Sequence, residues 1–207
     1  MTYQVSAQCR QVLVACESSG TVREAFRKMG HNAWSCDLLP SDDNSPYHYQ
    51  ADARLAISWG DWDVIIAHPP CTHLASSGAR HFAAKRADGR QQQGIDLFLD
   101  IEHLCRRHSR FGWAIENPIG IMSRLYRKPD QIIQPWMFGH PETKATCLWT
   151  SGLPLLAPTN NVKAEMLALP VAQRNRIHHM PPSKDRWKLR SKTYQGIADA
   201  MARQWGG

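Results

Sequence analysis

Residues 63–73 read Asp63-Val-Ile-Ile-Ala-His68-Pro69-Pro70-Cys71-Thr72-His73, an apolar run that stops abruptly at a polar turn. Such a run predicts a strand buried on both faces, as in a parallel sheet. A second segment of the same form is Phe111-Gly-Trp-Ala-Ile-Glu116-Asn117-Pro118. Residues just past the carboxyl ends of such strands line the ligand crevice of an open α/β sheet. The two segments therefore predict a site that pairs the Cys71 thiol with the Glu116 carboxylate, a nucleophile beside a proton-handling acid.

Strand-like and helical patterns alternate along the chain. Strands are expected over residues 11–16, 32–36, 63–67 and 111–115, with shorter extended segments over 131–137 and 144–149. Helices are expected over residues 21–29, 89–107, 191–205 and part of 162–177, with loops over 38–49 and 75–88, the second of them mobile. Thr21 is expected to cap the first helix and Gly30 to end it. The alternation predicts an α/β fold with a Rossmann-like, doubly wound, mostly parallel sheet that carries helices on both faces.

Length and composition place the chain among globular proteins. Its 207 residues, 43% of them hydrophobic, fit a single domain with a substantial core. No apolar run approaches the ~20 residues of a membrane span, and residues 1–10 lack the apolar core of a signal peptide. The six cysteines, at positions 9, 16, 36, 71, 105 and 147, are scattered and form no CxxC pair. We therefore expect a reduced, cytoplasmic protein with no membrane partner and no bound metal.

The net charge of +7 is unevenly distributed. Lysine and arginine are concentrated in residues 174–192, where Asp185 is the only acid. A local basic field of this kind suits phosphate groups. A solvated surface tail is the alternative, but Pro181-Pro182 and Trp187 supply rigid and aromatic elements that a tail does not need. We therefore expect this stretch to contact nucleic acid.

A cofactor site is expected at the ends of the first two strands. The turn Ala15-Cys16-Glu17-Ser18-Ser19-Gly20 has a single glycine, so it is neither a GxGxxG motif nor a P-loop. It can still hold a carboxylate or phosphate at the start of the following helix. Asp37 ends the second strand, where an acid accepts hydrogen bonds from ribose hydroxyls, and Asp52 could face an adenine. Each could alone be a cap or turn residue, but together they favour a nucleoside cofactor.

Nearly the whole chain resembles a small cytosine-5 DNA methyltransferase of the phage or prophage type. Pro70-Cys71 resembles the nucleophile motif of that family, and Glu116-Asn117 resembles the motif that grips the target base. Residues 12–26 resemble the methionine-binding turn, and residues 191–202 resemble the C-terminal motif that folds back beside it. The resemblance implies S-adenosylmethionine as cofactor. It implies a cofactor site formed by Cys16, Glu17, Ser18, Ser19, Gly20, Asp37, Leu38, Asp52, Ala53, His68 and Thr193.

The chemistry that the resemblance implies needs these residue types. The Cys71 thiolate adds to carbon 6 of cytosine, Glu116 stabilises the adduct at ring nitrogen N3, and Asn117 and Pro70 shape the pocket. A free thiol has a pKa of about 8.5, so Cys71 needs help from a neighbour such as His68, His73 or Arg80. The cytosine must also be flipped out of a duplex to reach the thiol.

The chain departs from larger family members in its recognition region. They carry a sizeable target-recognition domain before the last motif, whereas here only residues 151–190 occupy that place, as a reduced basic segment within a single catalytic domain of residues 1–207. Residues 191–207 would form the helix that returns to the cofactor site. Duplex DNA is the expected partner, and its expected contacts are Arg80, Lys144, Arg174, Arg176, Lys184, Arg186, Trp187, Lys188 and Arg190.

Other functions stay open at this point. Methyltransferases that act on exocyclic amines carry Asp/Asn-Pro-Pro-aromatic where this chain has His68-Pro69-Pro70-Cys71. A free cytosine nucleotide, single-stranded DNA or RNA as substrate would explain the small recognition region. A catalytically silent DNA-binding protein on the same scaffold is a further alternative, because a fold does not fix a function. The sequence leaves the target site and the oligomeric state undetermined.

Overall fold

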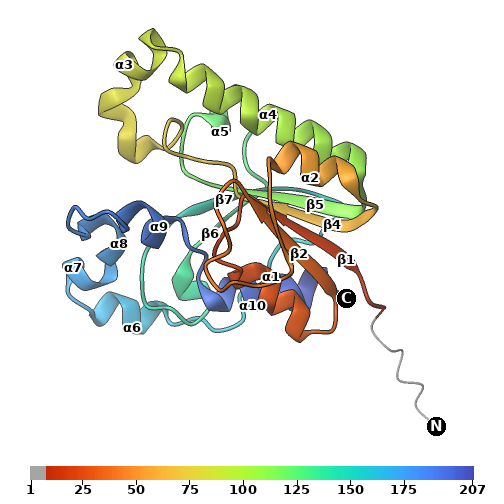
Figure 1. Cartoon of the computed structure of the whole chain (residues 1–207). Helices are drawn as coiled ribbons and strands as arrows, with labels where there is room; N and C mark the ends of the chain where they lie inside the picture. Colours follow the sequence, from red (N-terminus) through yellow and green to blue (C-terminus); the bar gives the residue numbers. More distant parts are fainter. Residues whose placement is uncertain (1–7) are drawn as a thin grey trace.

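The computed structural model describes residues 8–207; residues 1–7, which belong to the N-terminal stretch considered above for a signal peptide, lie outside the described part. A seven-stranded sheet with the order β3-β2-β1-β4-β5-β7-β6 forms the centre of the fold (Figure 1). Its strands are β1 (Gln11–Ala15), β2 (Asn32–Asp37), β3 (His48–Gln50), β4 (Trp62–Ala67), β5 (Ser109–Pro118), β6 (Gln131–Ile133) and β7 (Thr146–Ser151). Only β7 runs antiparallel to its neighbours β5 and β6. The predicted mostly parallel α/β sheet is therefore confirmed.

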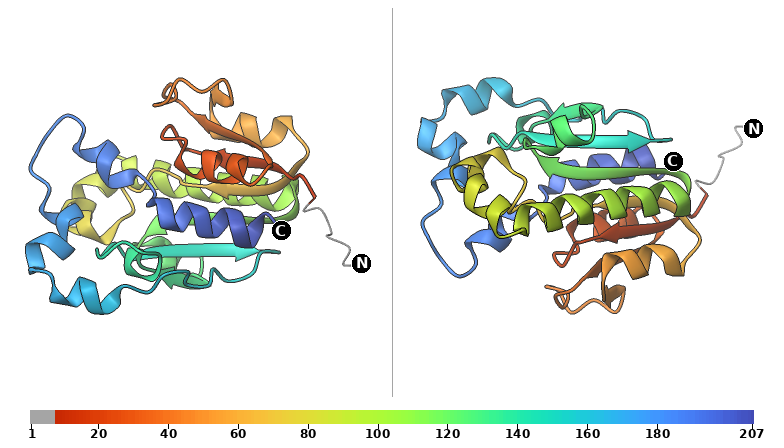
Figure 2. Two further views of the ribbon diagram at one scale, coloured as in Figure 1. Left: turned by 90° about the horizontal axis from the view of Figure 1, so that it is seen from below. Right: turned by 90° about the horizontal axis from the view of Figure 1, so that it is seen from above.

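Helices cover both faces of the sheet (Figures 1 and 2). Helices α1 (Thr21–Lys28) and α10 (Gln195–Trp205) pack together on one face, while α2 (Ala53–Trp59) and α4 (Arg90–His108) pack together on the other. The alternation of side chains along β1 explains both layers. Val12 and Val14 belong to the core under α1 and α10, whereas Leu13 belongs to the core under α2 and α4.

Shorter elements surround the edge of the sheet at which β1 and β4 end. The 3₁₀ helix η1 (Ser76–His81) and helix α3 (Phe82–Ala87) lead into α4, and α5 (Met122–Leu125) follows β5. The 3₁₀ helix η2 (Pro135–Met137) lies between β6 and β7. Helices α6 (Lys163–Ala168), α7 (Val171–Arg174), α8 (Arg176–His179) and α9 (Arg186–Ser191) form a group beyond the sheet, apart from α3 (Figure 1). Within the described residues, no helix is long and apolar enough to cross a membrane.

Three predictions of loops and extended segments were wrong. The loop predicted over residues 75–88 is helical, because η1 and α3 are anchored by Lys85, whose buried Nζ donates to the Thr72 carbonyl at 2.6 Å. The loop predicted over residues 38–49 contains most of β3, which pairs with β2 and stacks Tyr49 on Trp34. The extended segment predicted over residues 131–137 ends at Ile133, because Pro135 begins a 3₁₀ turn.

Candidate active site

Strands β1 and β4 end at one level in the sheet, and their neighbours β2 and β5 pass that level. Ala15 of β1 lies beside Cys36 of β2 and Ala67 of β4, and Ala67 lies beside Ile115 of β5. The residues that follow in these strands therefore form a row across the sheet, in the order Asp37, Cys16, His68, Glu116. The direction of strand order reverses between β1 and β4, which is where open α/β sheets bind ligands. The row places Asp37, the predicted ribose-binding acid, and Glu116, the predicted base-gripping acid, at the same edge of the sheet.

His68 and Glu116 are in direct contact in this row. His68 Nδ1 lies 2.8 Å from Glu116 Oε2, and the two side chains are only 11% and 13% exposed. Burial opposes ionisation of Glu116, but the hydrogen bond and charge of His68, together with the charge of Lys144, outweigh it and lower the pKa of the carboxyl. An ionised Glu116 can only accept, so the hydrogen must reside on Nδ1. His68 Nε2 is buried without a hydrogen-bond partner among residues 8–207.

The turn that carries Cys71 is fastened to the end of β5. Asn117 Nδ2 donates to the Pro69 carbonyl at 2.8 Å, and Asn117 is buried. Farther along, the Ile121 N–H donates to the Leu74 carbonyl at 3.0 Å. These hydrogen bonds join the Pro-Pro-Cys turn to the Glu-Asn end of β5. Pro70 itself is exposed, beside the half-buried Cys71.

The surroundings of Cys71 disfavour the ionised form of its thiol. Burial raises its pKa, and the Glu116 carboxylate raises it further, while the positive charges of Lys144 and Arg190 partly offset the increase. Lys144 and Arg190 were expected to contact DNA, and the structure brings both within electrostatic reach of the thiol. His73, one of the expected helpers, has a buried Nδ1 without a partner within the described part of the chain.

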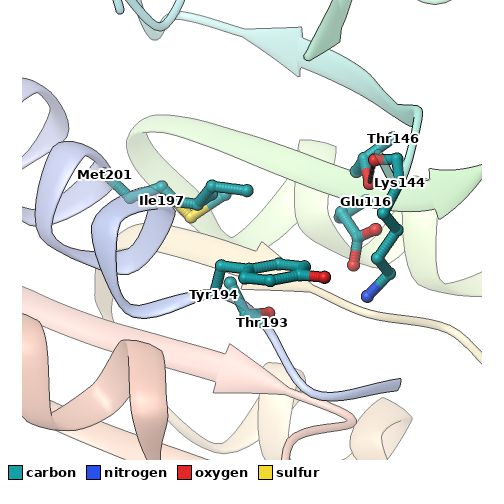
Figure 3. A pocket seen from close by; sticks show the side chains of 7 residues that line it. All are labelled: Glu116, Lys144, Thr146, Thr193, Tyr194, Ile197 and Met201. Atoms are coloured by element: carbon teal, nitrogen blue, oxygen red, sulfur yellow. Dashed lines mark hydrogen bonds between the residues drawn. The ribbon is translucent and has the colours of Figure 1, made fainter. Parts of the chain in front are cut away.

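A small cavity opens beside Glu116 (Figure 3). Its volume of about 10 Å³ is room for about one water molecule, far less than a nucleobase needs. Glu116, Lys144 and the Tyr194 hydroxyl point toward it from three separate segments, as Figure 3 shows. Thr193, expected at the cofactor, also lines it. Sequence reasoning missed Tyr194; its position directly before the last amphipathic helix, next to Thr193, was the available signal.

The turn after β1 is stabilised from within. The buried Glu17 carboxylate accepts hydrogen bonds from the N–H groups of Val22 at 2.8 Å and Arg23 at 3.2 Å. The prediction that Thr21 caps this helix was wrong, because Thr21 is the first helical residue and Glu17 supplies the cap. Gly20 has φ 66°, and a Cβ there would lie 2.2 Å from the guanidinium of buried Arg23. Two of the donors that a cofactor carboxylate could have used are therefore already engaged.

The nucleoside half of the predicted cofactor site fits better. Asp37 is half-buried at the end of β2 and accepts one hydrogen bond, from the Leu39 N–H at 3.0 Å. Leu38 is 72% exposed directly beside it, an apolar side chain suited to the face of an adenine. Asp52 instead caps α2 and forms an ion pair with Arg54 at 2.7 Å, so its carboxylate is committed. Asp37, Leu38 and the backbone of residues 16–20 are the groups that could hold S-adenosylmethionine. Ala53, also expected at the cofactor, is buried as the first residue of α2.

The remaining basic residues of the predicted interface lie on two groups of helices. Arg80 is exposed on η1, and Lys184 and Trp187 are exposed in the region of α9. Others are engaged within the protein: Arg176 pairs with Glu142 at 2.9 Å, and Lys188 pairs with Asp42 at 2.7 Å. The side chain of Arg186 donates to the Met180 carbonyl, and the carbonyl of Arg174 accepts from Thr143. In the described residues, no group of three or more His, Cys, Asp or Glu side chains is placed to hold a metal ion.

A comparison with solved structures finds proteins whose fold is similar to that of this chain. One similar solved structure is a protein provisionally described as a DNA modification methyltransferase encoded within a prophage, from E. coli, with a TM-score of 0.53 and 15% sequence identity. The two proteins share a fold. The match covers 78% of this chain and 56% of the other, so the chain spans little more than half the length of that protein. No protein-family model and no curated protein matches the sequence.

Proposed function

We propose that this protein transfers a methyl group from S-adenosylmethionine to carbon 5 of cytosine in DNA through a covalent Cys71 adduct. The observation that carries the proposal is the fastening of the Cys71 turn to the end of β5, where Asn117 binds the Pro69 carbonyl and Glu116 lies beside His68. A thiol and a carboxylate held at adjacent strand ends are the groups that nucleophilic addition with acid assistance requires. The methyltransferase-like fold supports the same proposal.

The side chains divide the chemistry between them. In the proposed reaction the sulfur of Cys71 bonds to carbon 6 of cytosine, and the π electrons move through the ring toward N3, where a proton is needed. The His68–Glu116 pair holds one proton between two buried groups and can share it with N3. Once carbon 5 carries the methyl group, a base removes its remaining proton, the electron pair of that C–H bond restores the ring double bond as the bond from sulfur to carbon 6 breaks, and the proton at N3 returns to the pair. S-adenosylmethionine, when bound, supplies an electrophilic methyl group for carbon 5.

The raised pKa of Cys71 is consistent with a site that becomes active only when substrate enters. Bringing a nucleobase beside Glu116 requires Lys144 or the segment at Thr193 and Tyr194 to move, because the cavity there has room for about one water molecule. Movement of Lys144 toward Cys71 would stabilise the thiolate, since its positive charge already lowers the pKa of that thiol. Substrate entry and thiol activation would then be coupled.

The proposal is tested by incubating the purified protein with S-adenosylmethionine and duplex DNA, digesting to nucleosides and measuring modified cytosine by mass spectrometry. Cys71→Ala is compared with Cys9→Ala, which removes an exposed thiol. Formation of 5-methylcytosine by the wild type and Cys9→Ala, and not by Cys71→Ala, is the expected result. A methylated exocyclic amine that survives Cys71→Ala would reject the covalent mechanism. Product on RNA or a free cytosine nucleotide alone would reject DNA as the substrate.

A further inference from the structure

A second and larger cavity shares no lining residue with the one beside Glu116. Its volume of about 630 Å³ falls within the range of roughly 300–1,000 Å³ that is typical of ligand sites. It lies between the α3–α4 junction and α5, which Figure 1 shows on the same side of the sheet. Its lining residues are Arg86, Gln91, Gln92, Ile95, Ile121, Arg124 and Leu125, of which only Ile121 was named above, for the hydrogen bond of its N–H to the Cys71 turn.

The charge of this cavity is positive. Arg86 and Arg124 are exposed, and across residues 8–207 neither guanidinium is paired with a carboxylate. No acidic side chain lines the cavity. Of the acids next to it in sequence, Asp88 pairs with Arg90, and Asp96 accepts from Nε2 of the lining residue Gln92 at 2.8 Å. Two free guanidinium groups at one opening suit phosphate oxygens, which they can bind through paired hydrogen bonds.

The rest of the lining suits a nucleobase. Ile95, Ile121 and Leu125 provide an apolar surface, which fits the face of a base. The carboxamides of Gln91 and Gln92 each use one N–H within the protein, on the His73 carbonyl and on Asp96, and each keeps its carbonyl oxygen and second N–H for the polar edge of a base. A ligand with anionic, flat apolar and polar-edged parts is a nucleotide.

The cavity is connected to the proposed nucleophile through two hydrogen bonds. Gln91 Nε2 donates to the His73 carbonyl at 3.3 Å, and the Ile121 N–H donates to the Leu74 carbonyl at 3.0 Å. Both carbonyls belong to the turn that begins at Cys71. An occupant of the cavity therefore contacts residues that hold this turn in place, within reach of a strand that delivers a base to Cys71.

We propose that this cavity binds a nucleotide of the substrate strand close to the target cytosine. Arg86 and Arg124 bind its phosphate groups, and Gln91 and Gln92 contact the edge of its base. The inference rests on the proposed function. It gives the protein a position for reading the strand outside the reduced segment of residues 151–190.

The test combines photochemical crosslinking with equilibrium binding of the full-length protein. An oligonucleotide with one cytosine and a 4-thiothymidine at each neighbouring position in turn is irradiated with the protein, and crosslinked peptides are identified by mass spectrometry. In parallel, the dissociation constant for the unmodified oligonucleotide is measured against salt concentration for the wild type, for the double variant Arg86→Gln/Arg124→Gln and for Arg107→Gln. Arg107 is an exposed arginine near the far end of α4 and serves as the matched control.

Crosslinks to peptides containing residues 91–95 or 121–125 are expected. The double variant should weaken binding at least about tenfold, since hydrogen bonds to charged groups are lost. The plot of log binding constant against log salt concentration should become less steep by about two, because each phosphate contact contributes roughly 0.7–0.9 to that slope and two contacts are lost. Arg107→Gln should leave both quantities unchanged. Thermal unfolding checks that the double variant is folded.

Crosslinks confined to residues 151–192, or a double variant that binds like Arg107→Gln, would overturn the inference. So would a wild type that binds no oligonucleotide. Binding of adenosine monophosphate is measured for the same variants. If the double variant loses this binding but still binds the oligonucleotide, the cavity holds a small effector and the strand position is rejected. Expected crosslinks without any 5-methylcytosine formation would reject the proposed function and support the cavity as a strand site.

Discussion

His68 Nδ1 lies 2.8 Å from Glu116 Oε2, and this hydrogen bond joins the carboxyl ends of β4 and β5 at the proposed catalytic centre. Both groups are titratable, both are largely buried, and they are separated by 48 positions in the chain. The pair ties the protonation of Glu116, the proposed base-gripping acid, to a histidine that directly follows β4.

Replacing His68 with alanine should destabilise the protein by about 1–3 kcal/mol at neutral pH, because it leaves the Glu116 carboxylate buried without its partner. The folded-state pKa of Glu116 is lowered, so its contribution to stability is present above its unfolded value and is lost as the pH falls through the folded value. The difference between His68→Ala and the wild type should therefore narrow on acidification. Urea unfolding at several pH values measures it.

The matched control for this prediction is His103→Ala, which removes an exposed histidine from α4. It should change the free energy of unfolding little at any pH. A destabilisation by His68→Ala that stayed constant from neutral to acidic pH would mean that lost packing, and not the ionised Glu116, causes the effect.

The reactivity of Cys71 toward iodoacetamide should rise with pH beyond the ordinary thiol value of about 8.5, because burial and Glu116 raise its pKa. Lys144→Met should move this profile to still higher pH, since the Lys144 charge stabilises the thiolate. Alkylation of the Cys71 peptide is followed by mass spectrometry, with Lys28→Met as the control for an exposed lysine. Half-maximal reactivity below the ordinary thiol value would contradict the expected protonated thiol.

Asn117→Ala should lower the free energy of unfolding by about 1–3 kcal/mol, because it removes the buried donor to the Pro69 carbonyl. It should also loosen the Cys71 turn, so that Cys71 is alkylated faster relative to the exposed Cys9. Chemical denaturation and the ratio of the two alkylation rates are the measurements. Gln93→Ala on the exposed surface of α4 is the control. An unchanged ratio in Asn117→Ala would show that the turn is held by other contacts.

Gly20→Ala should be more destabilising than Gly30→Ala, although both glycines have positive φ angles of 66° and 88°. An added Cβ at Gly30 meets nothing within 4 Å, so it incurs only the left-handed strain of roughly 1–2 kcal/mol. At Gly20 it also overlaps the Arg23 guanidinium, and crowding of this kind adds about 1–3 kcal/mol. Equal losses in the two variants would mean that Arg23 can move away at little cost.

The strand ends could be predicted from the sequence because their signals are local. Apolar runs stop at His68 and at Glu116, and the parallel-sheet rule places both at one edge. Helix α4 was predictable for the same reason, since its apolar positions repeat at helical spacing over a long stretch. The helical form of residues 76–87 was missed, because it depends on the buried Lys85 reaching the Thr72 carbonyl, a contact that local pattern does not encode.

The sequence by itself determined the α/β class, the mostly parallel sheet and the two segments that meet at its edge, because these features follow from the spacing of hydrophobic residues along the chain. Only the tertiary structure decided which partners the polar groups take. In the structure Glu17 accepts hydrogen bonds from the N-terminus of α1, Asp52 pairs with Arg54, and Glu116 pairs with His68. The physical reason is clearest at Glu116, since a buried charge must find a hydrogen-bond partner and the register of β4 and β5 brings His68, 48 positions away in the chain, within reach of it.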